Sequence, residues 1–175
     1  MLVKLYERLR QKYYRNPVDK LREGGAVIGD NVHIYDGGGT SIDYKFCFLL
    51  TIGNNVTISN TTLLFHDASI KKELKYVKIG KIIIGDNVFV GAGSIILPNV
   101  SIGNRVIIGA GSVVSKDIPD GVVAAGNPIR IIGAYDDYMN KCSNWISTKP
   151  CFREESLEEQ KELIQRELDG WGFIK

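Results

Sequence analysis

The chain is poor in the residues from which metal sites and nucleic-acid sites are built. Its 175 residues include two histidines, and 22 basic side chains nearly cancel 20 acidic ones to leave a net charge of +2. So small a net charge gives no reason to expect a nucleic-acid partner. Two histidines also fall short of the three imidazole ligands of a carbonic-anhydrase-like zinc site, and we expect no bound metal.

Cysteines and long apolar runs are scarce as well. The three cysteines, Cys47, Cys142 and Cys151, are an odd number without the spacing of a metal site, which favours reduced thiols in a cytoplasmic protein. No apolar run reaches the roughly 18 residues of a transmembrane helix, and we expect no signal peptide at the start. With 44% hydrophobic residues, the chain can bury the core of one soluble domain.

What the chain does have is a period of six residues. An aliphatic residue returns at every sixth position, at Ile84, Val90, Ile96, Ile102, Ile108 and Val114. A second buried position is expected four residues after each, at Val88, Ser94, Val100, Val106, Ser112 and Ile118, and the aliphatic phase recurs earlier at Ile28, Ile34, Ile52, Ile58 and Leu64. A helix would repeat every three or four residues and a simple strand every two. The period therefore predicts short strands and turns wound into a solenoid.

Three six-residue segments make one triangular coil of about 18 residues, and successive coils stack at the interstrand spacing of a sheet. The corners carry residues that accept a positive φ, as in Gly29-Asp30-Asn31, Gly53-Asn54-Asn55 and Gly85-Asp86-Asn87. A glycine-rich β-sandwich is the alternative, but sandwiches do not keep a strict period of six.

The sequence divides into three parts. Residues 1–23 are predicted to form an amphipathic helix that caps the open first coil. Its basic excess leaves a weak contact with a membrane surface as an alternative role. Residues 24–133 hold the coils, and a phase break of two residues predicts that 70–83 leaves them as a protruding loop. Residues 134–175 form a C-terminal extension with a charged amphipathic helix over 155–168.

Three stretches of the repeat resemble the hexapeptide-repeat acyltransferases. They are Ile84-Gly85-Asp86-Asn87-Val88, Ile108-Gly109-Ala110-Gly111-Ser112-Val113-Val114 and Ala125-Gly126-Asn127-Pro128. Over roughly residues 24–133 the chain is most similar to bacterial sugar and polysaccharide O-acetyltransferases. The resemblance implies an all-β solenoid, a left-handed parallel β-helix, and a homotrimer that binds acetyl-CoA in a groove between neighbouring β-helices. The left-handed coils rest on the resemblance alone, because crossover connections are usually right-handed.

His66 is the residue expected to carry the chemistry. It comes two positions after Leu64, which is expected to point inward, so its imidazole is predicted to face outward at a corner just before the protruding loop. Acyl transfer needs a base near neutral pH to take a proton from the acceptor. The resemblance implies the same role, because relatives carry a catalytic histidine ahead of such a loop. His33 occupies a position typical of a solvent-facing coil residue.

Two carboxylates are candidates for acceptor binding. Asp67 directly follows the base, and it either orients the loop or the acceptor or stabilises a turn. Asp36 lies upstream, where similar sugar acetyltransferases have a polar residue that helps to bind the acceptor from the adjacent subunit.

The groove for acetyl-CoA needs bare backbone that can approach the amides of the pantetheine arm. The candidates are Gly91, Ala92, Gly93, Gly109, Ala110 and Gly111. Steric demand at tight corners explains the same glycines equally well. Phe89 stands where many relatives have a tryptophan against the cofactor arm, and it keeps the apolar face without the indole donor. Lys116 and Arg130 either meet the CoA phosphates or are solvated surface charges.

The sequence therefore predicts an acetyltransferase that moves an acetyl group from acetyl-CoA to a hydroxyl of a sugar or of a cell-surface polysaccharide or its precursor. N-acetylation of an amino sugar, free or nucleotide-linked, uses the same base chemistry and stays open. A structural or ice-binding solenoid would show flat rows of threonine, which are absent at coil spacing. A binding solenoid without turnover is the remaining alternative.

Overall fold

The structure is a computed structural model, and it describes residues 16–35, 41–148, 151–152, 157–168, 170 and 172–174. The chain forms two compact units, which meet in sequence between Tyr135 and Asp136. Unit 1 holds the three sheets of the coils, a separate two-stranded sheet and the candidate site. Unit 2 holds most of a long helix, a shorter helix and a pair of short strands.

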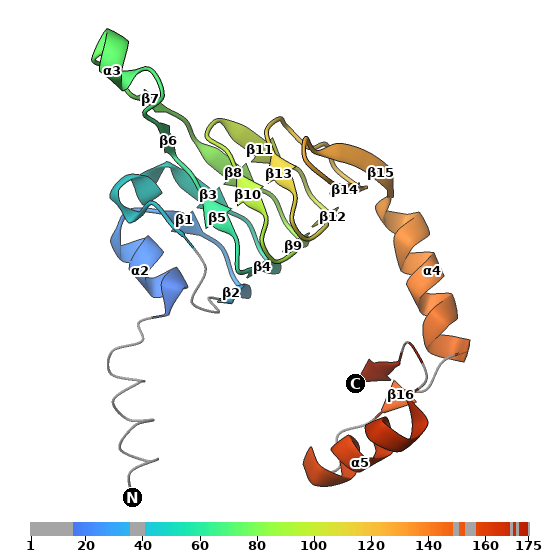
Figure 1. The fold of residues 1–175 in the computed structure, drawn as a ribbon. Helices are drawn as coiled ribbons and strands as arrows, with labels where there is room; N and C mark the ends of the chain where they lie inside the picture. The colour runs from blue at the N-terminus through green and yellow to red at the C-terminus, as the bar shows by residue number, and fades with distance from the viewer. Residues whose placement is uncertain are drawn as a thin grey trace, which may run out of the picture. The chain divides into compact units, whose positions relative to one another are not determined.

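The coils of unit 1 are formed by a four-stranded, a three-stranded and a six-stranded sheet (Figure 1). The four-stranded sheet contains β1 (Val27–Ile28), β3 (Leu50–Ile52), β8 (Ile82–Ile84) and β11 (Val100–Ile102), in that order. The three-stranded sheet contains β5 (Thr62–Leu63), β10 (Ile95–Ile96) and β13 (Val113–Val114). The six-stranded sheet contains β2 (Val32–Tyr35), β4 (Val56–Ser59), β9 (Val88–Val90), β12 (Val106–Ile108), β14 (Val122–Ala125) and β15 (Arg130–Ala134).

The chain visits the three sheets in turn, which winds it into coils. Strands β8, β9 and β10 lie one in each sheet, and β11, β12 and β13 repeat the same order. Ile82 pairs with Val100 and Val88 pairs with Val106, so the two coils are offset by 18 residues, as the period of six predicts. All pairs within these sheets are parallel except the last, β14 with β15.

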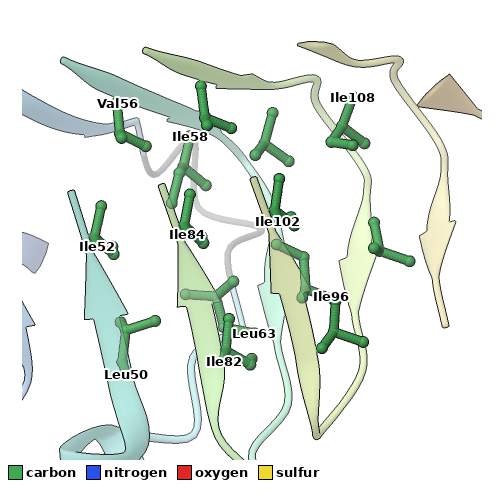
Figure 2. Packing of buried hydrophobic residues seen from close by; sticks show 14 of the residues in the cluster. Leu50, Ile52, Val56, Ile58, Leu63, Ile82, Ile84, Ile96, Ile102 and Ile108 are labelled. Atoms are coloured by element: carbon green, nitrogen blue, oxygen red, sulfur yellow. The ribbon is translucent and has the colours of Figure 1, made fainter. Parts of the chain in front are cut away.

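The core lies between the three sheets and is built from the predicted inward positions (Figure 2). All twelve of those predicted between Ile84 and Ile118 are buried, and each is at most 3% exposed. Ile82, Ile83 and Ile84 alternate between buried and exposed, as expected for a strand with one face on the core. Buried polar groups are satisfied, since the Ser94 hydroxyl donates to the carbonyl oxygen of Gly91 at 2.7 Å.

One predicted inward position is wrong. Leu64 is only half-buried, and Leu63 takes the core position instead with no exposed surface. The register gives the reason. Ile58 pairs with Val90 and Leu63 pairs with Ile96, so the turn between the two inward residues is one residue shorter in the earlier coil.

One corner of the coils is held by a ladder of side-chain hydrogen bonds. The residues with positive φ at this corner are Asn31, Asn55, Asn87 and Arg105, at +53° to +57°. Backbone N–H groups donate to a side-chain oxygen in the next coil, from Asp30 to Asn54, from Asn54 to Asp86, from Asp86 to Asn104 and from Asn104 to Asp120, at 2.6–2.9 Å. Aspartate and asparagine alternate along the ladder, so no two carboxylates are direct neighbours.

A short helix lies at the first coil. Helix α2 (Pro17–Glu23) begins after Asn16, whose side chain accepts a hydrogen bond from the N–H of Val18 at 3.0 Å. It buries Val18 and Leu21 and contacts β1, β2 and the 3₁₀-helix η1 (Tyr44–Leu49). The sequence predicted a helix over 1–23, and residues 1–15 of that prediction lie outside the described residues.

An arm leaves the coils between β5 and β8, and we define it as residues 66–79 (Figure 1). It consists of β6 (His66–Asp67), α3 (Lys71–Leu74) and β7 (Lys78–Ile79), with β6 and β7 antiparallel. The sequence placed the loop at 70–83. In the structure the arm begins four residues earlier, at His66. It also ends earlier, because Ile82 and Ile84 fill core positions and Ile82–Ile84 therefore belongs to the coils.

Unit 2 follows β15. Helix α4 (Tyr135–Thr148) leads from unit 1 into it, and α5 (Leu157–Glu167) and the parallel pair β16 (Cys151–Phe152) and β17 (Phe173–Ile174) complete it. Within the part of the chain that the structure describes, no helix is both long and apolar enough to span a bilayer.

Candidate active site

His66 stands at the root of the arm with its side chain partly open to solvent. The preceding residue, Phe65, is fully buried, so the alternation of a strand turns His66 away from the core. The His66 side chain is 38% exposed. Across the arm, His66 lies in register with Ile79. The predicted outward direction is therefore present, although Leu63 and Phe65 set it rather than Leu64.

Asp43 holds the imidazole of His66 in place. Its Oδ2 atom is the hydrogen-bond partner of His66 Nδ1, and its side chain is 15% exposed. The residue before Asp43, Ile42, bridges Leu63 in parallel, and the N–H of Asp43 donates to the Leu63 carbonyl oxygen at 3.3 Å. An ionised carboxylate can only accept, so Nδ1 carries the proton and Nε2 keeps a free lone pair. Nε2 is therefore the atom that can act as a base.

An aromatic surface adjoins the imidazole. The ring of Phe46, in η1, packs against His66 with centroids 5.2 Å apart and planes inclined by 44°. Phe48 lies next to Phe46 with ring centroids 6.3 Å apart, and it is 57% exposed. The ammonium of Lys45 sits over the Phe46 ring, 5.5 Å from its centroid. This segment thus places aromatic faces and one cation beside the base.

The carboxylate of Asp67 is engaged inside the arm. It pairs with the ammonium of Lys78 at 2.5 Å and accepts the N–H of Ser69 at 2.8 Å. The hydrogen bond from Lys78, and then those from Ser69, lower the pKa of Asp67 from 3.8 to about 2. Asp67 is therefore ionised at neutral pH. Its observed contacts fix the base of the arm.

The candidate cofactor glycines fall into two kinds. Gly91 and Gly109 face the next coil so closely that an added Cβ would lie 2.5 Å from Ala110 N in one case and 2.8 Å from Ala125 Cβ in the other. Gly93 and Gly111 instead have positive φ, +73° and +68°, and both are exposed. A Cβ added to Gly111 would meet nothing within 4 Å. Steric demand thus explains the first pair, whereas the second pair offers open backbone.

The remaining cofactor candidates are on the surface. Phe89, in β9, is 43% exposed and points away from the core, and Ala92 and Ala110 are exposed beside the glycines. Lys116 follows β13 and Arg130 begins β15. Both are exposed, and neither forms an ion pair with any other residue that the structure describes.

One chain does not bring all the candidates together. The turns 91–93 and 109–111, which we call the glycine turns, precede β10 and β13 and so lie at the start of the parallel strands of the three-stranded sheet. His66 instead comes after the end of β5 in the same sheet. The base and the glycine turns therefore lie beyond opposite ends of these strands. Asp36 lies outside the described residues. His33 is exposed, and its Nε2 atom is 3.0 Å from Asn31 Oδ1.

Neither Asp43 nor the aromatic residues of η1 were predicted from the sequence. The chain between Tyr35 and Leu50 does not keep the period of six, so its residues could not be assigned to a coil position. The signal that was available is composition, because Tyr44, Phe46 and Phe48 alternate with smaller or charged residues directly after Asp43. No cluster of three or more histidine, cysteine or acidic residues within the described ranges could hold a metal ion.

Comparison with known proteins gives concordant matches. The family model described as bacterial transferase hexapeptide (six repeats) matches residues 81–116. The chain is 41% identical over 128 residues to protein CapG of Staphylococcus aureus. The aligned region covers 70% of this chain and 74% of CapG. It is 40% identical over 117 residues to galactoside O-acetyltransferase of Escherichia coli (strain K12). The aligned region covers 62% of this chain and 57% of that enzyme.

A solved structure supports the same family. A galactoside acetyltransferase in complex with coenzyme A superposes with a TM-score of 0.54 at 32% sequence identity, covering 73% of this chain and 76% of that one.

Proposed function

We propose that the acetyl acceptor of this protein is a hydroxyl group of a sugar, free or in a cell-surface polysaccharide or its precursor. The chain belongs to the hexapeptide-repeat transferases and is an acetyl-CoA-dependent acetyltransferase. The observation that carries this proposal is the His66–Asp43 pair, which engages Nδ1 of a 38% exposed imidazole beside an aromatic side chain and leaves Nε2 to act as the base. Similarity to a galactoside O-acetyltransferase supports the sugar hydroxyl.

The proposed reaction is a direct transfer. Nε2 of His66 takes the proton of the acceptor hydroxyl while that oxygen attacks the thioester carbonyl carbon of acetyl-CoA. The C–S bond of the resulting tetrahedral intermediate then breaks, and the departing thiolate takes the proton back from the imidazolium. Asp43 stabilises the imidazolium between these two steps and keeps the ring in one orientation. The products are the acetylated sugar and CoA, and His66 is regenerated.

We propose that the coils are left-handed and that three chains form a trimer with the active site between neighbours. Two observations support a shared site. The glycine turns and His66 lie beyond opposite ends of the three-stranded sheet, and Phe89 projects from a different sheet. A neighbouring chain can supply the donor groove that a single chain does not place beside its own base. Light scattering that finds only monomer at micromolar concentration would contradict the shared site.

The donor groove is assigned to the surface next to the open glycines. Gly93 and Gly111 leave bare backbone for the pantetheine amides, with Gly91, Ala92, Gly109 and Ala110 beside them. Phe89 supplies an apolar face for the same arm. Lys116 and Arg130 are the proposed partners of the CoA phosphates, since both are exposed cations without an acidic partner among the described residues. Asp67 and Asp36 remain proposed contacts of the acceptor.

A direct test is CoA release from acetyl-CoA with a panel of neutral, acidic and amino sugars. The proposal predicts release that depends on a sugar hydroxyl, with a product whose acetyl group is removed by mild alkali, as expected for an ester. An alkali-stable product formed only from amino sugars would show N-acetylation instead. The absence of sugar-dependent release would contradict the proposed acceptor class.

A further inference from the structure

Lys45 and the lysines of the arm outnumber the carboxylates of these segments that are free to pair with them. Asp43 is engaged by the imidazole and Asp67 by Lys78. The arm carries Glu73 as its other acidic residue against four lysines, Lys71, Lys72, Lys75 and Lys78. The ammonium of Lys75 turns back to the Lys72 carbonyl oxygen at 2.8 Å. Lys71 and Lys72 are exposed and form no ion pair with another described residue.

Lys45 places one such cation on the aromatic ring that packs against the base. Its ammonium and the imidazole of His66 both contact the ring of Phe46, at 5.5 Å and 5.2 Å from that ring's centroid. Lys45 is exposed and has no acidic partner within the described part of the chain. A cation one aromatic ring away from the base can hold a negative group of a molecule whose hydroxyl reaches Nε2.

The aromatic side chains define the shape of what is held. Phe46 and Phe48 lie side by side, and Phe48 exposes 57% of its surface. A pyranose ring has an apolar face of C–H groups that packs on such rings. Among the described residues, the carboxylate that contacts the imidazole is that of Asp43, which is 15% exposed and lies on the Nδ1 side of the ring. The Phe46 ring packs against the imidazole, and the Lys45 ammonium lies on that same ring.

We infer that the acceptor is an anionic sugar, one that carries a carboxylate or a phosphate, and that Lys45 selects it by pairing with that group. This inference rests on the proposed acetyl transfer to a sugar. Phe46 and Phe48 hold the sugar ring, Lys45 holds the anion, and His66 takes the proton of the hydroxyl that is acetylated. The lysines of the arm add a positive field that favours the same charge.

The test compares acceptors that differ in charge but keep the same ring hydroxyls. Methyl glucoside, carboxymethyl glucoside and glucose 1-phosphate differ only at the anomeric carbon. Methyl xyloside and methyl glucuronoside form a second pair, in which neither member has a hydroxyl at C6. We expect kcat/KM of the wild type to be about three- to tenfold higher for the charged member of at least one series, through a lower KM. A gain with the carboxylates alone or with the phosphate alone identifies which anion is recognised.

Lys45→Gln should remove this preference by raising the KM of the charged acceptors, with kcat and the neutral acceptors unchanged. Lys45→Arg should keep it. Lys141→Gln is the matched control, because Lys141 also lies over an aromatic ring, 5.0 Å from the centroid of Trp145, in the α4 helix. Equal kcat/KM for charged and neutral acceptors, or an equal loss for both in Lys45→Gln, would overturn the inference.

Failure of the proposed function is a separate outcome. If no sugar of either kind releases CoA, acetyl transfer to sugars is wrong, and calorimetric binding of the same sugars decides the role of Lys45. Tighter binding of the charged sugar to the wild type than to Lys45→Gln supports an anion site, and equal binding overturns it.

Discussion

The Nδ1 atom of His66 is hydrogen-bonded to the carboxylate of Asp43, a residue 23 positions earlier in the chain. The contact joins two neighbouring coils, because the segment that ends in Asp43 runs parallel to β5, the strand that leads to His66. It fixes the tautomer of the imidazole and leaves Nε2 for the acceptor. The pair has the geometry of a base and the group that orients it.

Asp43→Asn should lower kcat because an amide stabilises the imidazolium less well than a carboxylate does. The expected loss is roughly 10- to 1,000-fold, with little change in the KM of acetyl-CoA. Steady-state kinetics with both substrates measure it. Asp120→Asn is the matched control, since Asp120 is also a hydrogen-bonded carboxylate, accepting the N–H of Asn104 at 2.7 Å, but has no proposed role in the site. Equal loss of kcat in the two variants would remove the special role of Asp43.

Gly111→Ala separates backbone strain from cofactor binding. The φ of +68° should make alanine cost about 1 kcal/mol of stability, and the added methyl group points into open space. If that space is the donor groove, the KM of acetyl-CoA should rise severalfold. Gly121→Ala is the control, because Gly121 has a φ of +72° and equally open surroundings but no proposed cofactor contact. The same KM in both variants would place the groove elsewhere.

Ile102→Asp tests the register of the coils. Ile102 is 1% exposed in the core, so the substitution buries an unpaired charge at a cost of about 3–5 kcal/mol. Ile83→Asp is the control, since Ile83 lies in the neighbouring strand β8 but is 43% exposed. We expect thermal melting to show a large loss for Ile102→Asp and a much smaller one for Ile83→Asp. Comparable melting temperatures would mean that the inward positions are misassigned.

The ion pair between Asp67 and Lys78 should be visible in the titration of Asp67. Its pKa of about 2 lies below the ordinary 3.8, so the pair stabilises the arm fully above pH 3.8 and loses this contribution as the pH falls through 2. Lys78→Gln should move the pKa of Asp67 back toward 3.8, as measured by NMR of the carboxyl carbon. A pKa that stays near 2 in this variant would show that Lys78 is not its cause.

The period of six was enough to predict the coils, because each inward position is set by packing between stacked strands. Its predictive power ended where a turn changed length. The turn before Leu63 is one residue shorter than its counterpart before Ile96, and the inward assignment failed at Leu64 as a result. The corner residues Asn31, Asn55 and Asn87 were predictable because few side chains other than asparagine accept a positive φ readily.

The site was only partly predictable. His66 could be found because it is one of two histidines and precedes the break in the period. Its partner Asp43 lies in an irregular segment, and only the three-dimensional path of that segment beside β5 brings the two together. The residues that orient the base are long-range contacts, and a local pattern does not carry them.

His66→Ala tests the central claim most directly. The side chain is 38% exposed at the root of the arm, so its removal should leave the fold and the binding of acetyl-CoA nearly unchanged. Turnover in a folded His66→Ala protein, measured as CoA release with a sugar that the wild type acetylates, should fall by roughly 10²- to 10⁴-fold, the usual contribution of a positioned base. Turnover at the wild-type rate in that folded protein would contradict a mechanism in which His66 takes the proton of the acceptor.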